Sequence, residues 1–324
     1  MTPGIVESLT GSRLAQAVKQ RARELGFDLV GVAPAAASQY RDYLRRWLDD
    51  GQAGEMRYLA GRFEERTDPG NYLPGAASVI CVAMNYHVSL EPPPADGSRR
   101  GRVARYALGD DYHEIIKSRL HALADWLREI APAAQTRACV DTAPVMEKEV
   151  AARAGVGWVG KNTCMINAVA GSWLLLGEVI TTLPLPPDAP ATDHSGTCTR
   201  CIDACPTGAI TAPYQLDARK CISYLTIEHR GDIVPELQAQ MRDWLYGCDV
   251  CQDVCPHNRR PPEAADPLLR PRFPSGTLDL DEVENWTDEK YRTALRGSAM
   301  KRAKLPVLQR NARIVAQNLS GDRS

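Results

Sequence analysis

The chain has 324 residues, of which 44% are hydrophobic and 24% charged, and its formal net charge at pH 7 is -1. This is an ordinary soluble globular composition, long enough for about two domains, and a charge so near zero gives no overall field that would indicate a partner. The sequence has no run of 18 apolar residues, and MTPGIVESLTGSR lacks the regions of a signal peptide, so we expect a cytoplasmic protein without a membrane segment.

The first part of the chain, residues 1–183, is predicted to be an α/β domain. One helix shows the apolar spacing clearly: between Asp111 and Ile130, apolar residues recur every three or four positions and form one face. The predicted elements in chain order are a helix at 12–26, strands at 28–34 and 78–86, a helix at 111–130, a strand at 136–141, a helix at 143–155 and a strand at 172–182. This alternation indicates helices layered on a sheet.

Basic residues gather at two places. One cluster falls on an expected loop and consists of Arg99, Arg100, Arg102 and Arg105. The other is the C-terminus, where nine Lys or Arg follow residue 289 against one acidic residue, Asp322. This tail is either a solvated helix surface or a phosphate-binding surface. If it binds RNA, the candidate residues are Lys301, Arg302 and Lys304.

A proline-rich break, LPLPPDAPATDH, precedes the cysteine region. We therefore predict an iron-sulfur domain at 184–262, followed by a basic helical region at 263–324 that resembles a truncated helical repeat.

Ten cysteines in a cytosolic chain favour metal binding or catalysis over disulfides. Seven of them lie between Cys198 and Cys255, while Cys81 and Cys139 fall in short apolar runs and are predicted to be buried.

The cysteine spacing is typical of a two-cluster ferredoxin. Two groups end in C-x2-C-x3-C-P, and in ferredoxins the last cysteine of each motif binds the other cluster. The second cluster then has four thiol ligands, namely Cys205, Cys221, Cys248 and Cys251. The first has only three, Cys198, Cys201 and Cys255, because Ser195 occupies the position of the fourth.

Ser195 makes the first cluster unusual. A serine hydroxyl loses its proton far less readily than a thiol, whose free pKa is about 8.5, so we expect a weakly held fourth iron or a 3Fe-4S form. His194 is out of register by one residue and is an alternative ligand. Zinc ribbons also contain paired C-x2-C motifs, but the two Cys-Pro endings favour iron-sulfur clusters.

Several stretches outside the cysteines carry a further resemblance. They are FEERTDP, RYALGDDYH, VDTAPVMEKEVAARAGVGWVGKNT, KCISYLTIEHRG, CDVCQDVCPHN and RGSAMKRAK, spread over almost the whole chain. With them the sequence resembles the epoxyqueuosine reductase family. The resemblance implies reduction of epoxyqueuosine to queuosine at the wobble position of tRNAs with a GUN anticodon, those for Tyr, His, Asp and Asn. It also implies that two 4Fe-4S clusters pass electrons to cobalamin.

The resemblance further implies which residues serve the reaction. The corrinoid pocket would use Arg66, Asp141, Lys161, Asn162, Ser223, Cys248 and Asp249. Simpler roles stay open for some of them: Arg66 could pair with Glu64 or Glu65, the Lys161–Asn162 segment could be an ordinary turn, and Ser223 could be a helix cap. The cobalt-binding motif Asp-x-His-x-x-Gly is absent, since Asp111-Tyr112-His113 begins it and then departs from it.

Asp141 is the implied proton donor. It lies at the predicted junction of a strand and a helix, where either a catalytic residue or an N-cap is expected. Opening the epoxide produces an alkoxide that must leave as water, which requires a proton, and burial beside a corrin would raise the pKa of this carboxyl group and retain that proton.

Two other functions share parts of this pattern, a corrinoid-dependent reductive dehalogenase and a ferredoxin-like electron carrier. The dehalogenases usually carry a twin-arginine signal, which is absent here, and a carrier does not need about 190 residues before its clusters. We expect a monomer that takes its electrons from an external donor.

Overall fold

The computed structural model describes residues 11–321. Outside these residues lie most of the N-terminal segment in which we expect no signal peptide, and also Asp322 and Arg323 of the basic tail. Within the described part, no helix is long and apolar enough to cross a membrane.

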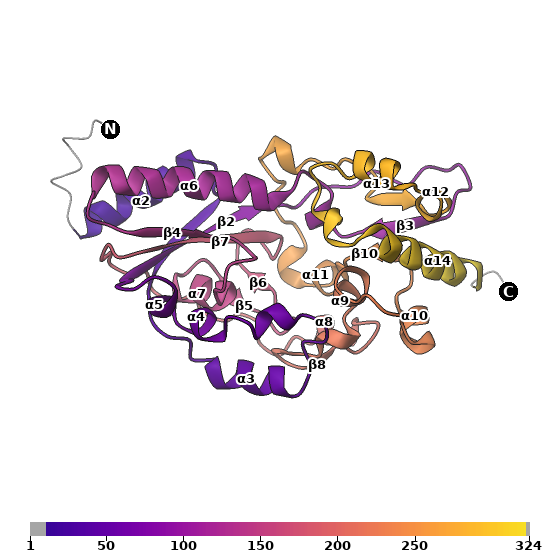
Figure 1. Ribbon diagram of the computed structural model, residues 1–324, viewed down its shortest axis with the longest axis horizontal. Coiled ribbons are helices and arrows are strands. Elements are labelled where there is room, and N and C mark those ends of the chain that lie inside the picture. Colours follow the sequence, from indigo (N-terminus) through magenta and orange to yellow (C-terminus); the bar gives the residue numbers. More distant parts are fainter. Residues whose placement is uncertain (1–10, 322–324) are drawn as a thin grey trace.

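The main sheet contains four strands in the order β1 (Leu29–Pro34), β2 (Ser78–Asn85), β7 (Leu174–Thr181) and β4 (Thr136–Cys139). All neighbouring strands are antiparallel. Helices α2 (Ser12–Glu24) and α6 (Tyr112–Ile130) lie on one side of the sheet, and the short helix α7 (Glu147–Arg153) lies on the other (Figure 1). The predicted helix-on-sheet arrangement is thus confirmed for this part of the chain.

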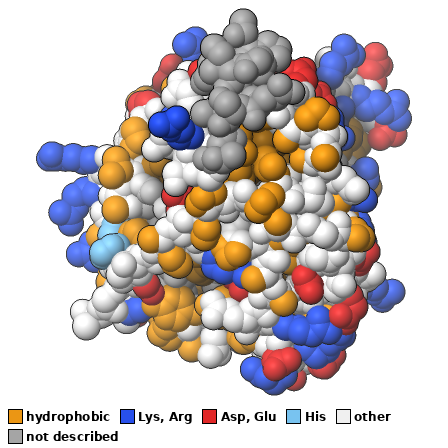
Figure 2. Space-filling model, turned by 90° about the vertical axis from the view of Figure 1, so that its left-hand side faces the viewer, with side chains coloured by type: hydrophobic (Ala, Val, Ile, Leu, Met, Phe, Trp, Pro, Cys, Tyr) orange, Lys and Arg blue, Asp and Glu red, His pale blue; other side chains and the backbone are white. Residues whose placement is uncertain are grey.

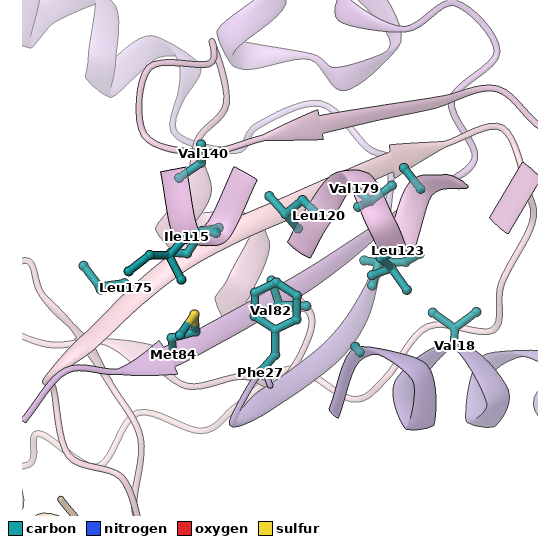
Figure 3. Packing of buried hydrophobic residues seen from close by; sticks show 14 of the residues in the cluster. Val18, Phe27, Val82, Met84, Ile115, Leu120, Leu123, Val140, Leu175 and Val179 are labelled. Carbon is teal, nitrogen blue, oxygen red and sulfur yellow. The ribbon is translucent and has the colours of Figure 1, made fainter. Parts of the chain in front are cut away.

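Strand β2 shows why the sheet needs cover on both faces. All eight of its residues are buried. Side chains alternate between the two faces of a strand. Ile80, Val82 and Met84 therefore join the core under α2 and α6, and Val79, Cys81 and Ala83 face α7. Figure 3 shows Val82 and Met84 beside Phe27 in the first of these layers. The predicted burial of Cys81 and Cys139 is confirmed.

The connection between β4 and α7 differs from the prediction. The helix begins at Glu147 rather than near Ala143, and its N-cap is Met146. Asp141 is therefore not a helix cap. It lies in the turn after β4 with a positive φ of 42°, a conformation uncommon for residues other than glycine.

A second sheet joins distant parts of the chain. Strand β3 (Arg100–Val103) lies between β10 (Trp244–Tyr246), to which it is parallel, and the antiparallel β11 (Thr277–Asp279). The prediction of a loop at the first basic cluster was wrong, because pairing with strands more than 140 positions away fixes this segment in a sheet. The arginines of this cluster form ion pairs with acidic residues of the same chain, as Arg99 does with Asp281 and Arg105 with Asp249.

The cysteine region consists of short elements. They are α8 (Arg200–Asp203), β8 (Ile210–Ala212), β9 (Gln215–Leu216), α9 (Ile222–Ile227), α10 (Pro235–Gln240) and α11 (Val250–Asp253). The small pair β5 (Trp158–Val159) and β6 (Met165–Ile166) precedes them. On the lower side in Figure 1 lie α3 (Arg41–Asp49), α4 (Phe63–Thr67) and α5 (Pro69–Tyr72).

The C-terminal region contains the predicted helices but also supplies part of the core. Its helices are α12 (Leu280–Glu284), α13 (Asp288–Ala294) and α14 (Leu305–Gly321). Leu308 and Val315 of α14 are fully buried and pack in one cluster with Leu245 of β10 and Val103 of β3. Short 3-10 turns complete the fold: η1 (Arg57–Leu59), η2 (Arg105–Ala107), η3 (Ala218–Lys220), η4 (Pro256–Asn258), η5 (Pro267–Leu269) and η6 (Ala299–Arg302).

One face of the molecule shows the mixed charge that a net charge near zero predicts (Figure 2). Figure 2 views the end of the molecule that lies at the left in Figure 1, and there acidic and basic side chains are interspersed with hydrophobic ones. No single sign of charge dominates this face.

Candidate active site and cluster sites

Asp141 lies where two elements approach each other. Its carboxylate oxygen Oδ2 is 3.2 Å from Nε2 of His113 on α6, and its backbone N–H donates to Oε1 of Glu147 at 2.7 Å. The Asp141 side chain is 54% exposed. The turn after β4 therefore presents an accessible carboxylate that is fixed at both its backbone and its side chain.

His113 is held by the start of α6. Asp111 is the N-cap of this helix and accepts the backbone N–H of His113, and its Oδ1 lies 2.7 Å from Nδ1 of the same imidazole. Burial disfavours the charged ring, but the hydrogen bonds to Asp111 and Asp141 outweigh it and raise the pKa of His113 to about 9. Below that pH the imidazole carries a proton between two carboxylates.

Sequence reasoning missed this role of His113. In the sequence, Asp111-Tyr112-His113 indicates only the start of a cobalt-binding motif. An Asp two residues before a His at a helix start is itself a signal, since the N-cap carboxylate can reach both the backbone and the ring of that His. The contact with Asp141, 28 positions later, has no local signal.

Aromatic rings surround the pair. The Tyr112 ring stacks on His113 with centroids 4.0 Å apart, and the Tyr106 ring meets Tyr112 edge to face at 6.1 Å. Tyr106 donates to the hydroxyl of Tyr246 at 3.4 Å, and that hydroxyl donates to the carbonyl of Ala299 at 2.9 Å. Burial, and then the charge of Asp141, raises the pKa of Tyr112 far above its usual value, so this phenol stays neutral.

Cationic groups border the same carboxylate. Arg66, at the end of α4, lies close enough to feel the charges of Glu147 and Asp141, and its buried Nε has no hydrogen-bond partner in the described residues. Burial lowers the pKa of this arginine. The alternative pairing of Arg66 with Glu64 or Glu65 is not seen, because those acids bind Arg41 and Arg62 instead. Arg66 thus retains a donor for a bound group.

Lys161 and Asn162 contact the cysteine loops. Nζ of Lys161 donates to the carbonyls of Gly196 and Cys198, at 2.6 and 3.0 Å. Nδ2 of Asn162 donates to the carbonyl of Cys251 at 3.4 Å. This turn therefore connects the two cysteine motifs, and Nζ of Lys161 is occupied by carbonyls of the protein.

The remaining predicted corrinoid residues belong to the cysteine region. Asp249 is 2% exposed and accepts the backbone N–H and the Nη1 of Arg105, at 2.9 and 3.1 Å. Burial raises its pKa to about 6, although Arg105 opposes this shift. Ser223 is the second residue of α9, whose N-cap is Cys221, so it is not a cap. Cys248 directly precedes Asp249.

The predicted first cluster group comes together around one pocket. This pocket is open to solvent and is lined by residues that include Cys198, Cys201, Cys255, Ser195 and His194. Burial raises the pKa of the Cys201 thiol, and the Cys255 and Cys198 thiolates are near enough to raise it further.

Ser195 is fixed inside this pocket by an indole ring. Its Oγ accepts a hydrogen bond of 3.3 Å from Nε1 of Trp158. The Trp158 ring contacts the imidazoles of His194 and His257 edge to face, with centroid distances of 5.1 and 5.0 Å. The position that lacks a thiol is therefore ordered and polar.

The second group is also assembled. Burial raises the pKa of Cys248, and Cys221 and Cys205 contribute to the shift through their charge. The pKa of Cys251 is raised well above its usual value, first by a hydrogen bond with Cys164, a cysteine outside both predicted groups, then by burial, with smaller contributions from Cys221 and Cys248. In the described residues, His, Cys, Asp and Glu side chains do not form a group of three or more suited to a single metal ion.

The basic tail is partly internal. Arg302 pairs with Glu228 through two hydrogen bonds of 2.8 Å, and Arg310 donates to the backbone carbonyls of Leu225, His229 and Gly231. Lys301 and Lys304 are exposed. Of the predicted RNA-binding trio, Lys301 and Lys304 thus have no ion pair with any residue in 11–321.

Comparisons with known proteins agree with this arrangement. Residues 66–142 match the family model "Epoxyqueuosine reductase QueG, DUF1730", and residues 194–258 match a 4Fe-4S double cluster binding domain. The epoxyqueuosine reductase of Synechococcus sp. strain CC9605 is 44% identical over 93% of this chain and 94% of its own length. That of Escherichia coli K12 is 41% identical over 91% of this chain and 79% of its own length. The chain belongs to the epoxyqueuosine reductase family.

Solved members of the family share the fold. An epoxyqueuosine reductase crystallised with an epoxyqueuosine-modified tRNA-Tyr stem loop is 31% identical, with a TM-score of 0.88 over 94% of this chain and 81% of that one. The Bacillus subtilis enzyme, solved with its catalytic aspartate loop swung out of the active site, has a TM-score of 0.86 at 31% identity over the same shares.

Family membership decides between the alternatives. The protein is an oxidoreductase of the epoxyqueuosine reductase family, which rules against a simple electron carrier and disfavours the dehalogenase. The match to a double-cluster domain supports iron-sulfur clusters over zinc at residues 194–258.

Proposed function

We propose that this protein reduces epoxyqueuosine to queuosine at the wobble position of GUN-anticodon tRNAs, with Asp141 as the proton donor. The relatives carry the name of this activity, and one solved relative holds an epoxyqueuosine-modified stem loop. The observation that carries the proposal is the hydrogen bond between the accessible carboxylate of Asp141 and protonated His113.

The chemistry requires protons at this place. Removal of the epoxide oxygen consumes two electrons and two protons, forms a carbon–carbon double bond and releases water. The imidazolium of His113 keeps a proton within one hydrogen bond of Asp141. The pair can therefore protonate the departing oxygen and recover a proton from solvent between turnovers.

The electrons would come from an external donor through the two clusters, and cobalamin would supply the low-valent metal that reduces the substrate when it is bound. The residues around Asp141 fit such a group, because Arg66, which is near enough to feel the charge of Asp141, has a buried Nε without a hydrogen-bond partner among the described residues. Lys161, Asn162 and Asp249 already make hydrogen bonds within the protein. We assign them the task of holding the cysteine loops in place beside this group.

The turn that carries Asp141 has counterparts in the family. In the Bacillus subtilis relative the catalytic aspartate loop can leave the active site. If the present turn behaves in the same way, its two contacts, with His113 and with Glu147, hold the inward position.

The test is single-turnover formation of queuosine on tRNA by chemically reduced protein. Asp141→Asn and Asp141→Ala should retain the fold and the bound cofactors but lose at least about a hundredfold in rate, the lower range for a lost general acid. Asp125→Asn, at an exposed position on α6, is the control. A near wild-type rate in Asp141→Asn would remove Asp141 from the mechanism.

A further inference from the structure

A second acidic group lies behind the Asp141 turn. Glu178 is in the middle of β7, paired in register with Cys81 of β2 and Cys139 of β4. It is 0% exposed, and neither of its carboxyl oxygens has a hydrogen-bond donor in regular geometry among the described residues. An ionised carboxylate in such surroundings would lose its hydration without compensation, so Glu178 is present as the neutral acid.

Glu178 shares its face of the sheet with two thiols and with helix α7. Cys81 and Cys139 point to the same side of the sheet, and burial raises the pKa of both thiols, so they are uncharged. Helix α7 packs on this face, where its Val150 and Ala151 form one cluster with the two cysteines. Burial, and then the charge of Glu147 at the start of α7, raise the pKa of Glu178, so Glu147 is an acidic neighbour of the buried acid.

Glu147 in turn connects to the active site. Burial and the charge of Asp141 raise the pKa of its carboxyl group, while Lys148 and Arg66 act in the opposite direction. Its Oε1 accepts the backbone N–H of Asp141 at 2.7 Å. Asp141 needs this contact, because its left-handed backbone is strained and is maintained only by its surroundings.

We propose that Glu147 and Glu178 are a proton-sharing carboxyl pair that positions the Asp141 turn. Neutral Glu178 donates a hydrogen bond that orients Glu147, and Glu147 holds the backbone of Asp141 in the conformation that lets its side chain meet His113. Both are positioning residues, and their importance for catalysis rests on the proposed function of Asp141.

Hydrogen exchange of the purified full-length protein tests the pair without substrate or turnover. Glu147→Ala should speed exchange in the 140–146 segment by about fivefold or more, since a hydrogen bond of this kind contributes about 1 kcal/mol. Glu178→Leu should have the same effect, because leucine fills the space but donates nothing. Glu178→Gln should retain protection, since its amide can donate in place of the acid.

Glu149→Ala is the matched control on the same helix. Glu149 is also buried, but it accepts from Ser38 and Gln39, far from Asp141. Equal loosening of 140–146 by Glu147→Ala and Glu149→Ala would overturn the proposal, as would unchanged exchange in Glu178→Leu. If Glu178→Leu does not fold, the decision rests on Glu147→Ala against Glu149→Ala. The exchange result stands even if Asp141 proves not to be the proton donor.

Discussion

At the scale of single residues, the active site depends on charges that the fold keeps close together. Asp111, His113 and Asp141 form a line in which one imidazolium is shared by two carboxylates. The N-cap of α6 and the turn after β4 supply the two ends of this line. The ionisation of the His113 imidazole therefore affects both the stability of the folded protein and the supply of a proton to Asp141.

The raised pKa of His113 predicts how stability depends on pH. The pKa rises from 6.5 to about 9 on folding, so the stabilisation is complete below pH 6.5 and is lost as the pH rises through 9. Its upper bound is about 3 kcal/mol. Urea unfolding of the wild type from pH 6 to pH 9.5 should show this loss, and His113→Gln should flatten it.

The control for this experiment is His121→Gln, at an exposed position of the same helix. It should keep the wild-type pH dependence. An identical decline of stability in His113→Gln would show that the loss comes from other groups.

Ser195 gives a prediction about the first cluster. Because the pocket offers three thiols and one hydroxyl, air-exposed protein should show the electron paramagnetic resonance signal of a 3Fe-4S cluster. Ser195→Cys should suppress this signal by supplying a fourth thiolate. Thr197→Cys places a thiol on the same loop but out of register and should leave the signal unchanged. Full 4Fe-4S occupancy in the wild type after oxidation would contradict the idea.

At the scale of elements, the helices and strands that could be predicted are those whose apolar pattern lies within the element itself. Helix α6 follows an apolar spacing of 3.6 and strand β2 is a short continuous apolar run, and both patterns are visible in the sequence to within a few residues. The cysteine groups were predictable for a similar reason, because cluster chemistry fixes their spacing. Strand β3 was not, since its partners are far away in the sequence and its own arginines are typical of a loop.

The candidate site shows the same division. The cysteines could be named from their spacing, and Asp141 and Arg66 from the resemblance to the family. The contacts that give them their properties could not, because they join elements whose approach depends on the whole core. Examples are His113 with Asp141 and Glu147 with Asp141.

The C-terminal element carries a prediction about RNA binding. Lys301→Ala combined with Lys304→Ala should weaken tRNA binding and reduce the slope of log K against log salt by up to about 1.4, since each phosphate contact contributes about 0.7. Arg302→Ala should instead lower thermal stability, because it leaves Glu228 without its partner. Lys117→Ala, at an exposed position of α6, is the control for removal of a positive charge. Unchanged affinity and slope in the double variant would make the tail a solvated surface.

At the scale of the whole molecule, the three segments that sequence composition separates are joined by the β10–β3–β11 sheet. The strand from the first segment is at its centre, and the strands on either side come from the cysteine region and the C-terminal region. The hydrophobic cluster beside this sheet also draws on all three, with Val103, Leu245 and Leu308 in contact through it. The cysteine loops are thus attached to the catalytic part of the protein through shared hydrogen bonds and a common core.

The central position of β3 also has a consequence during synthesis of the chain. A ribosome adds about 5–20 residues each second, so residues 100–103 wait on the order of ten to forty seconds before both flanking strands, which end at Tyr246 and Asp279, have been made. Until β10 has been made, both edges of β3 are open to pairing with other chains, a known route to aggregation, and one edge stays open until β11 follows. The arginines on this strand repel a second copy of it during this time, and Arg102 gains its acidic partner Asp253 only when the cysteine region has been made.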